Sequence, residues 1–256
     1  MTRATRWSFR HVVLCFVLGI AAPSGLPAQE GGSAPPPDQP LSAERPDLAG
    51  VGEALEALAA GKVREARQLL GRADRGGGSG LPGLMGDLLD AQRRPPTEAW
   101  FLQAEARGWQ IPGADYRAVV PRLRAALAEA EKPEPRRLLR GLLCHLRVLG
   151  GVEGPPEAEG GRVVSGDLQA PERTFQVQPD HTPEARRAGV QGVVIMQFVI
   201  DLEGCVKSDP KVQKGLPHGL DDAARGAIRW WVYEPAVLEG EPVSVYYNTT
   251  MNFRLP

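Results

Sequence analysis

The sequence predicts an α+β protein, with an all-α N-terminal region followed by a small α+β module. Apolar residues recur at helical spacing through residues 48–150. Residues 192–201 have the composition of a strand, and residues 243–255 alternate without interruption between a largely apolar and a largely polar set. Because successive side chains of a strand point to opposite faces, this alternation predicts one buried face and one solvated face.

The composition excludes two classes of partner. The chain has 256 residues, with 30 basic and 31 acidic side chains and a formal net charge of −1. This balance provides no electrostatic attraction for nucleic acid or for an anionic membrane surface. The length is that of two modest domains with additional tails.

The first 28 residues have the features of a secretory signal peptide. Three arginines precede an apolar segment at 12–22, and small residues offer a cleavage site near Ala28. Eleven apolar residues in a helix span about 16 Å, roughly half of the hydrocarbon core of a membrane. The sequence therefore predicts export to the periplasm with cleavage near Ala28. An uncleaved anchor in the inner membrane is the alternative.

A linker and a helical domain follow. Residues 29–47 are rich in proline, glycine and serine, as linkers are. Residues 60–73 look like the middle of a tetratricopeptide repeat, but no second clean copy follows. We therefore interpret 48–150 as a repeat-like helical domain. Beyond the first helices, which Gly61 separates, its helices are expected at 83–93, 97–108, 115–131 and 135–149.

The last of these helices carries a leucine stripe, and Cys144 falls on the opposite side of the helical wheel among arginines. We therefore expect Cys144 outside the core. Cys205 follows the glycine of a predicted hairpin turn and is expected to be exposed. The periplasm is oxidising. The sequence leaves open whether Cys144 and Cys205 form a disulfide or stay unpaired.

Residues 151–162 form a second predicted linker, and 163–256 form the C-terminal module. Its second strand contains Pro210, which lacks an amide donor and so predicts an edge or a bulge. A helix at 220–231 is expected to cover the sheet with its apolar face. Trp231 is predicted to be a core anchor. Trp230 lies on the flank of this helix and is expected to pack at the margin of the sheet.

Six motifs of the module stand in the order and spacing of a known family. They are PEARRAGVQG at 183–192, IDLEG at 200–204, GLDDAA at 219–224, RWWVYEPA at 229–236, GEPV at 240–243 and NFRL at 252–255. Together they make 163–256 resemble a TonB C-terminal domain. The resemblance implies a ββαβ fold, with the helix on a three-stranded antiparallel sheet. It also implies binding of an extended peptide of an outer-membrane transporter by strand addition.

The resemblance places the partner peptide along the last strand, on the edge opposite Pro210. It implies that the backbone there supplies hydrogen bonds and that outward-facing side chains supply further contacts. An open edge invites pairing, whereas a proline suppresses it. The expected partner-binding residues are Val245, Tyr246, Tyr247, Asn248 and Thr249.

The sequence contains no motif for catalysis, cofactor binding or metal binding. Asp201 and Glu203 flank a hairpin turn, where acidic residues are ordinary. The acids Asp221, Asp222 and Glu234 have no partner at a spacing that would indicate an acid pair. We therefore expect a protein that is not an enzyme, with no cofactor, no metal and no small-molecule substrate.

These observations lead to one main functional hypothesis. The chain is a periplasmic TonB-like protein that binds an extended segment of an outer-membrane transporter, or of another envelope protein, in TonB-dependent transport. A first alternative is an envelope adaptor whose helical domain is the main protein-binding surface. A second alternative is a short membrane-anchored energy transducer. Homodimerisation is left open.

Overall fold

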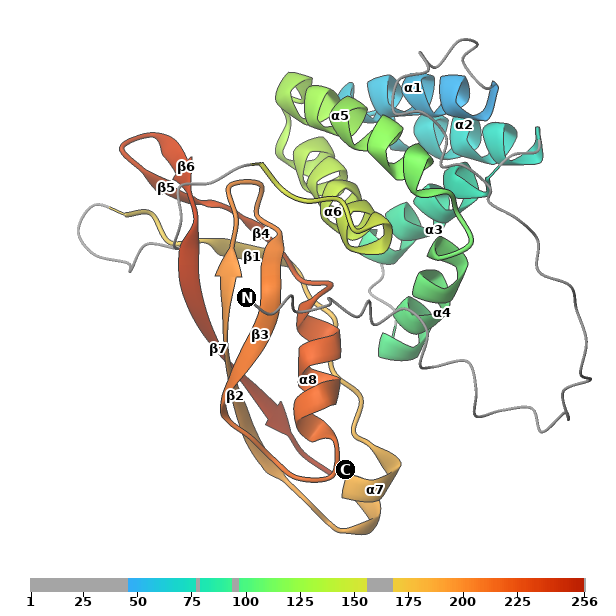
Figure 1. Ribbon diagram of the computed structural model, residues 1–256. Coiled ribbons are helices and arrows are strands. Elements are labelled where there is room, and N and C mark those ends of the chain that lie inside the picture. The colour runs from blue at the N-terminus through green and yellow to red at the C-terminus, as the bar shows by residue number, and fades with distance from the viewer. Residues whose placement is uncertain (1–45, 77–78, 94–96, 156–167, 256) are drawn as a thin grey trace, which may run out of the picture. The chain divides into compact units, whose positions relative to one another are not determined.

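The first half of the described chain is helical, as the sequence predicts. The computed structural model describes residues 46–255 except 77–78, 94–96 and 156–167 (Figure 1). The predicted signal peptide, nearly all of the linker 29–47, and residues 156–162 of the second linker lie outside this part. The helices are α1 (Pro46–Ala59), α2 (Val63–Arg75), α3 (Leu81–Arg93), α4 (Glu98–Gly108), α5 (Gly113–Glu129) and α6 (Pro133–Gly150).

Local sequence explains where these helices begin and end. Gly61 separates α1 from α2 with a φ of 82°, a conformation that glycine adopts without steric cost. Pro133 opens α6, where its missing amide is not needed. Gly151 ends α6 in the left-handed conformation, with a φ of 59°. Pro121 lies inside α5.

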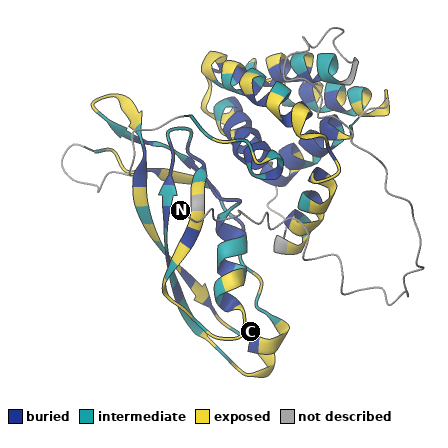
Figure 2. Ribbon diagram, in the orientation of Figure 1, coloured by how far each residue is buried: buried dark blue, intermediate teal, exposed yellow. Residues whose placement is uncertain are grey.

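Helix α6 is buried on nearly every side, which corrects one prediction. Its leucine stripe is buried in the core, as expected. The opposite side is also buried and contains Cys144, His145 and Arg147 (Figure 2). Cys144 is therefore not at an exposed position. A helix that is buried all round needs a partner on each face, and the second partner of α6 is the C-terminal module.

The C-terminal module is built on a three-stranded antiparallel sheet. Its strands are β2 (Gly192–Ile200), β3 (Val206–Lys214) and β7 (Val245–Phe253), in the order β3-β2-β7. Helix α8 (Leu220–Ile228) buries its apolar face against this sheet, which confirms the predicted α+β fold with a central first strand. Smaller elements are β1 (Glu172–Phe175), which pairs with β4 (Val232–Glu234), β5 (Ala236–Leu238), which pairs with β6 (Glu241–Val243), and α7 (Pro183–Arg187).

Pro210 occupies an edge strand that is also bulged, as predicted. Along β2, Gln197 and Val199 are two residues apart, but their partners on β3 are Lys211 and Lys207. The extra residues of β3 therefore include Pro210, whose missing amide is tolerated in such a place.

The two tryptophans after α8 are both buried, although only one was predicted to be. The helix ends at Ile228, three residues before the predicted end. Trp231 is a core residue, as expected, and its indole Nε1 donates a hydrogen bond to Val177 O at 2.8 Å. Trp230 is only 1% exposed and stacks on Phe101 of α4, with the ring centroids 4.7 Å apart. It belongs to the contact with the helices, so the prediction of a flank position was wrong.

Candidate functional site

Strand β7 has one buried and one solvated face. Val245, Met251 and Phe253 are buried, and the residues between them at odd positions are half-buried. The even-numbered residues from 246 to 252 are exposed, so burial alternates along the strand (Figure 2). Tyr246 has an exposed fraction of 43%, so its ring is accessible on the solvated face.

The outer edge of β7 carries free backbone groups. Within the part of the chain that the structure describes, β7 pairs only with β2. The amide of Asp201, directly after β2, donates to Cys205 O on the β3 side at 3.0 Å. Because successive strand residues direct their backbone groups to opposite edges, those of Ile200 point toward its partner Val245. The same alternation directs the amides of the even-numbered residues of β7, 246 to 252, to the open edge.

The two edges of the sheet differ in their chemistry. Strand β3 carries Lys207, Lys211 and Lys214, together with Pro210 and a bulge. These are the features by which edge strands avoid pairing with other chains. Strand β7 has neither a charged residue nor a proline from Val245 to Phe253. Only the β7 edge therefore combines free backbone groups with side chains that permit pairing.

Two aromatic rings from neighbouring strands support β7 from its inner face. Tyr247 contacts Phe198 of β2 and Tyr233 of β4, with centroid distances of 5.8 and 5.4 Å. Phe198 and Tyr233 are buried, whereas Tyr247 is half-buried. The rings fix the position of the strand at Tyr247. The neighbouring residues Tyr246 and Asn248 are thereby presented on a rigid element.

The end of the sheet at the β2–β3 turn, where Ile200 pairs with Val245, is bound to the helices by a disulfide and ion pairs. Cys144 of α6 and Cys205 are bonded, with their Cα atoms 5.2 Å apart. Cys205 is 3% exposed, so the expectation of an exposed position was wrong. Arg147 Nη1 lies 2.7 Å from a carboxylate oxygen of both Asp201 and Glu203. We call these five residues the junction.

Asp201 is a structural acid, with a larger role than that of the ordinary turn residue predicted. Its Oδ1 accepts hydrogen bonds from the amides of Glu203 and Cys205, both at 2.9 Å. Burial raises the pKa of Asp201, and the positive charge of Arg147 acts against this rise. Glu203 also pairs with Arg124 of α5. The two arginine partners are distant in the sequence, so spacing alone did not reveal them.

The junction does not provide a free metal site. The ligand atoms of Asp201, Glu203 and Cys205 lie within 4.8 Å of one another. However, the sulfur of Cys205 is bonded to Cys144, and both carboxylates are paired with arginine. A metal ion would have to displace these partners.

A buried histidine lies between the helices and the C-terminal module. His145 of α6 contacts the rings of Phe101, Phe175 and Trp230 at centroid distances of 5.1–5.7 Å. Its Nε2 is 3.1 Å from Trp230 O, which can only accept, so Nε2 carries the proton. Burial lowers the pKa of His145 to about 4. The ring is therefore neutral in the folded protein.

Acid should weaken the fold through this histidine. The unfolded chain takes up a proton near pH 6.5, whereas folded His145 resists protonation down to about pH 4. The stability that follows from keeping His145 neutral is fully present above pH 6.5 and is lost as the pH falls toward 4. We expect a loss of about 1–2 kcal/mol in the free energy of unfolding between pH 7 and pH 5. Denaturant titration of the wild type and of His145→Gln, which keeps a donor but does not titrate, measures the difference. Equal pH dependence in both would contradict the assignment.

Comparison with known proteins identifies the C-terminal module. Residues 177–255 match the family model described as Gram-negative bacterial TonB protein C-terminal. "Protein TonB" of Vibrio cholerae serotype O1 is 30% identical over 80 residues, which are 31% of this chain and 33% of that protein. "Protein TonB" of Xanthomonas campestris pv. campestris (strain B100) is 32% identical over 77 residues, 30% of this chain and 34% of that protein. The chain thus spans about a third of the length of these relatives.

The match confirms the resemblance that the six motifs predicted. It begins at residue 177, whereas the sequence predicted a domain boundary at 163. The helices α1–α6 lie outside it. Among the described residues, no helix is both long enough and apolar enough to cross a membrane.

Proposed function

We propose that this chain, which carries a TonB C-terminal domain at residues 177–255, binds an extended segment of an outer-membrane transporter or of another envelope protein. The segment adds to the sheet as a further strand beside β7, in TonB-dependent transport. The observation that carries this proposal is the open, uncharged edge of β7, which contrasts with the opposite edge at β3, where lysines and a proline protect the sheet. Binding requires no catalysis and no cofactor.

Strand addition divides affinity and selectivity between two parts of β7. Backbone groups of the even-numbered residues form hydrogen bonds with the added strand, whatever its sequence. The side chains of Tyr246 and Asn248 lie beside it on the solvated face, and Tyr247 and Thr249 lie on the inner face. Together with Val245, these are the partner-binding residues that the sequence predicted.

A proline at Asn248 tests the backbone contribution. It removes an amide donor from the open edge and leaves the pairing with β2 in place. One lost hydrogen bond is worth roughly 0.5–1.5 kcal/mol, so affinity should fall by a few-fold to about tenfold. Tyr246→Ala tests the side chain without changing the backbone. The measurement is fluorescence anisotropy of a labelled transporter-derived peptide.

Lys214→Ala provides the control on the opposite edge and should bind as the wild type does. Circular dichroism must show that each variant is folded. Folded β7 variants with wild-type affinity would exclude strand addition at this edge. If changes in the helices abolished binding at the same time, the adaptor function would replace it.

We also propose that the chain is exported and cleaved near Ala28. The proposal rests on the short apolar segment at 12–22 and its arginine-rich flank. The mature protein should begin near Gln29 and appear in the soluble periplasmic fraction. Mass spectrometry of the N-terminus measures this directly. An intact N-terminus in washed membranes would favour an anchored transducer.

A further inference from the structure

A groove between α2 and α3 lies outside the TonB domain and has no part in the proposed strand addition. Its volume is about 240 Å³. Half-buried Val63 supplies its accessible apolar surface, above buried Leu89, and Arg64, Arg67 and Arg93 supply its charged surface. A groove in which several guanidinium groups converge beside an apolar side chain has the character of a binding site for an anionic, partly apolar ligand.

The sequence of α2 places arginines along this groove. Ala66 and Leu70 are buried and hold the helix against its neighbours. Arg64 and Arg67 are three residues apart, so they lie on the same outward face. Helix α3 ends at Arg93, at the same end of the groove as Arg64. The helix pair therefore brings these cations together.

Two of these cations, Arg64 and Arg93, have no counterion among the residues that the structure describes. Arg67 is bound to Asp90 at 3.0 Å and lies 3.7 Å from Asp87. The remaining acid at this end, Glu65, pairs with Lys62 at 3.4 Å. Among the described residues, no acid pairs with Arg64 or Arg93.

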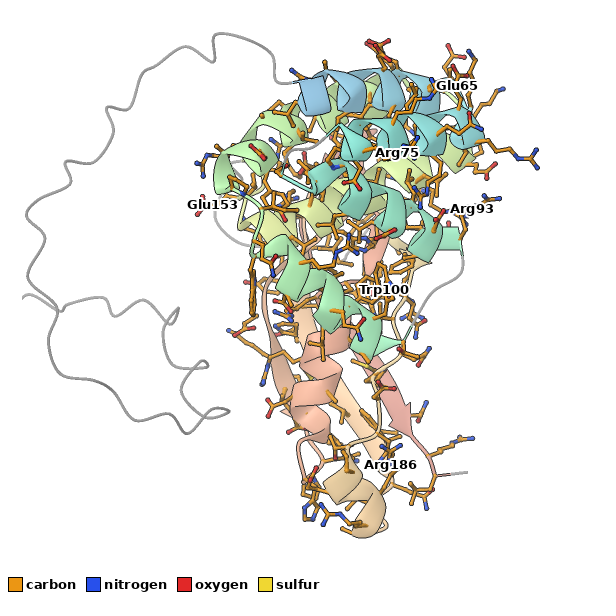
Figure 3. The ribbon with its side chains drawn as sticks, turned by 90° about the vertical axis from the view of Figure 1, so that its right-hand side faces the viewer. Glu65, Arg75, Arg93, Trp100, Glu153 and Arg186 are labelled. Atoms are coloured by element: carbon orange, nitrogen blue, oxygen red, sulfur yellow. A yellow bond between two sulfur atoms is a disulfide. The ribbon has the colours of Figure 1, made fainter. Side chains whose placement is uncertain are left out.

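The positions of these residues can be followed in Figure 3. Glu65 and Arg93 lie on the same side of the helices, and both line a second hollow, which shares Val63, Arg64 and Arg93 with the groove. Arg64 and Arg93 are exposed, so their guanidinium groups are accessible to a ligand. Arg75, eleven residues after Arg64 on α2, does not line the groove.

We propose that this groove binds an acidic peptide segment of a protein partner. Carboxylates of the segment pair with Arg64 and Arg93, for which the planar guanidinium is well suited. An apolar side chain between these carboxylates contacts Val63. The site would give the helical region a protein-binding role of its own, separate from the β7 edge.

The shape of the site favours a peptide over an anionic membrane. A lipid surface is recognised by a broad basic face, but Glu65 and Asp90 interrupt the positive charge here. The chain as a whole has a net charge of −1. A groove of about 240 Å³, with Val63 beside Arg64 and Arg93, fits one extended segment with alternating acidic and apolar side chains.

The test uses the mature protein and a fluorescein-labelled peptide in which aspartates alternate with leucines. Anisotropy should show binding that weakens as salt rises from low to physiological concentration. The double variant R64E/R93E should lose at least tenfold in affinity. The matched control R75E makes the same charge change on α2 outside the groove and should stay within twofold of the wild type.

Three outcomes would overturn the proposal. One is equal binding by the wild type and R64E/R93E, with circular dichroism showing both folded. Another is equal binding of a peptide in which asparagines replace the aspartates. The third is binding of vesicles containing phosphatidylglycerol, but not of the peptide, in a manner sensitive to R64E/R93E. The Tyr246→Ala variant should bind this peptide normally, so failure here is distinct from failure of strand addition.

Discussion

Replacing Arg147 with methionine is expected to lower the free energy of unfolding by about 3–5 kcal/mol, because the change leaves a buried carboxylate without its counterion. Asp201 is fully buried, and Glu203 is 14% exposed. Arg147 Nη1 lies 2.7 Å from a carboxylate oxygen of each. Methionine retains most of the packing volume of the arginine stem, so the lost charge dominates the effect. Denaturant titration at pH 7 measures it.

Two further variants separate charge from packing. Asp201→Asn in the Arg147→Met background removes the isolated charge and should recover a large part of the loss. Arg187→Met removes an exposed ion pair with Glu184, in which the two side chains are 75% and 59% exposed, and should cost less than about 1 kcal/mol. A loss as small for Arg147→Met as for Arg187→Met would show that the junction does not hold the fold.

The elements that the sequence predicts well are those with a strong local period. The helices from 48 to 150 and the alternation along β7 both follow from spacing within one segment. Pro210 indicates a strand at the edge of the sheet, because a proline has no backbone amide to donate to a neighbouring strand. The faces of Tyr246 and Tyr247 could likewise be predicted, since period-2 alternation fixes both at once. The binding role of β7 rests on family resemblance and on the open edge, and it stays a proposal.

Cys144 shows why helical periodicity can mislead. A wheel assigns the strongest apolar stripe of α6 to the core and its opposite side to solvent. That inference assumes one packing partner. Helix α6 has two, because the C-terminal module covers the second side and buries Cys144, His145 and Arg147. Because the second side carries polar residues, the sequence alone predicts that it is exposed. Its burial becomes evident only from the partners of these residues in the structure.

The partners of the junction are too distant in the sequence to be predicted from spacing. Arg147 and Glu203 are 56 residues apart, and Arg229 and Glu105, which also pair, are 124 apart. Trp230 is likewise distant in the sequence from its partner, Phe101, whose ring it contacts. A flank tryptophan followed by a core tryptophan has no periodic signature. Trp231 is buried within the C-terminal module, whereas the burial of Trp230 is explained by the docking of the helices.

Docking at the junction leaves the proposed binding edge accessible. The helices contact the turn between β2 and β3 through Cys205, and they contact the end of α8 through Trp230. Strand β7 lies on the other side of the central strand from β3. Among the residues described, the helices therefore contact the TonB domain without pairing with the β7 edge.

Removing the disulfide between Cys144 and Cys205 is expected to cause the other large loss in the free energy of unfolding. Cys144 and Cys205 are 61 residues apart in the sequence, and a cross-link of this span restricts the unfolded chain strongly. The chain-entropy relation gives a stabilisation of about 4 kcal/mol. The double variant Cys144→Ser/Cys205→Ser should therefore lose about this amount in denaturant titration. Thiol counting of the denatured, unreduced mature protein should find neither cysteine free.

Reduction provides the matched control, because it removes the same bond without changing the sequence. Dithiothreitol should lower the stability of the wild type to nearly that of the double variant and leave the double variant unchanged. A similar loss in both proteins would point to an effect of the reagent and not of the bond. Two free thiols in the unreduced wild type would show that Cys144 and Cys205 are unpaired in the exported protein. In that case the ion pairs of Arg147 and Arg124 with their carboxylates would hold the junction, and the Arg147→Met variant would be more severe than the double cysteine variant.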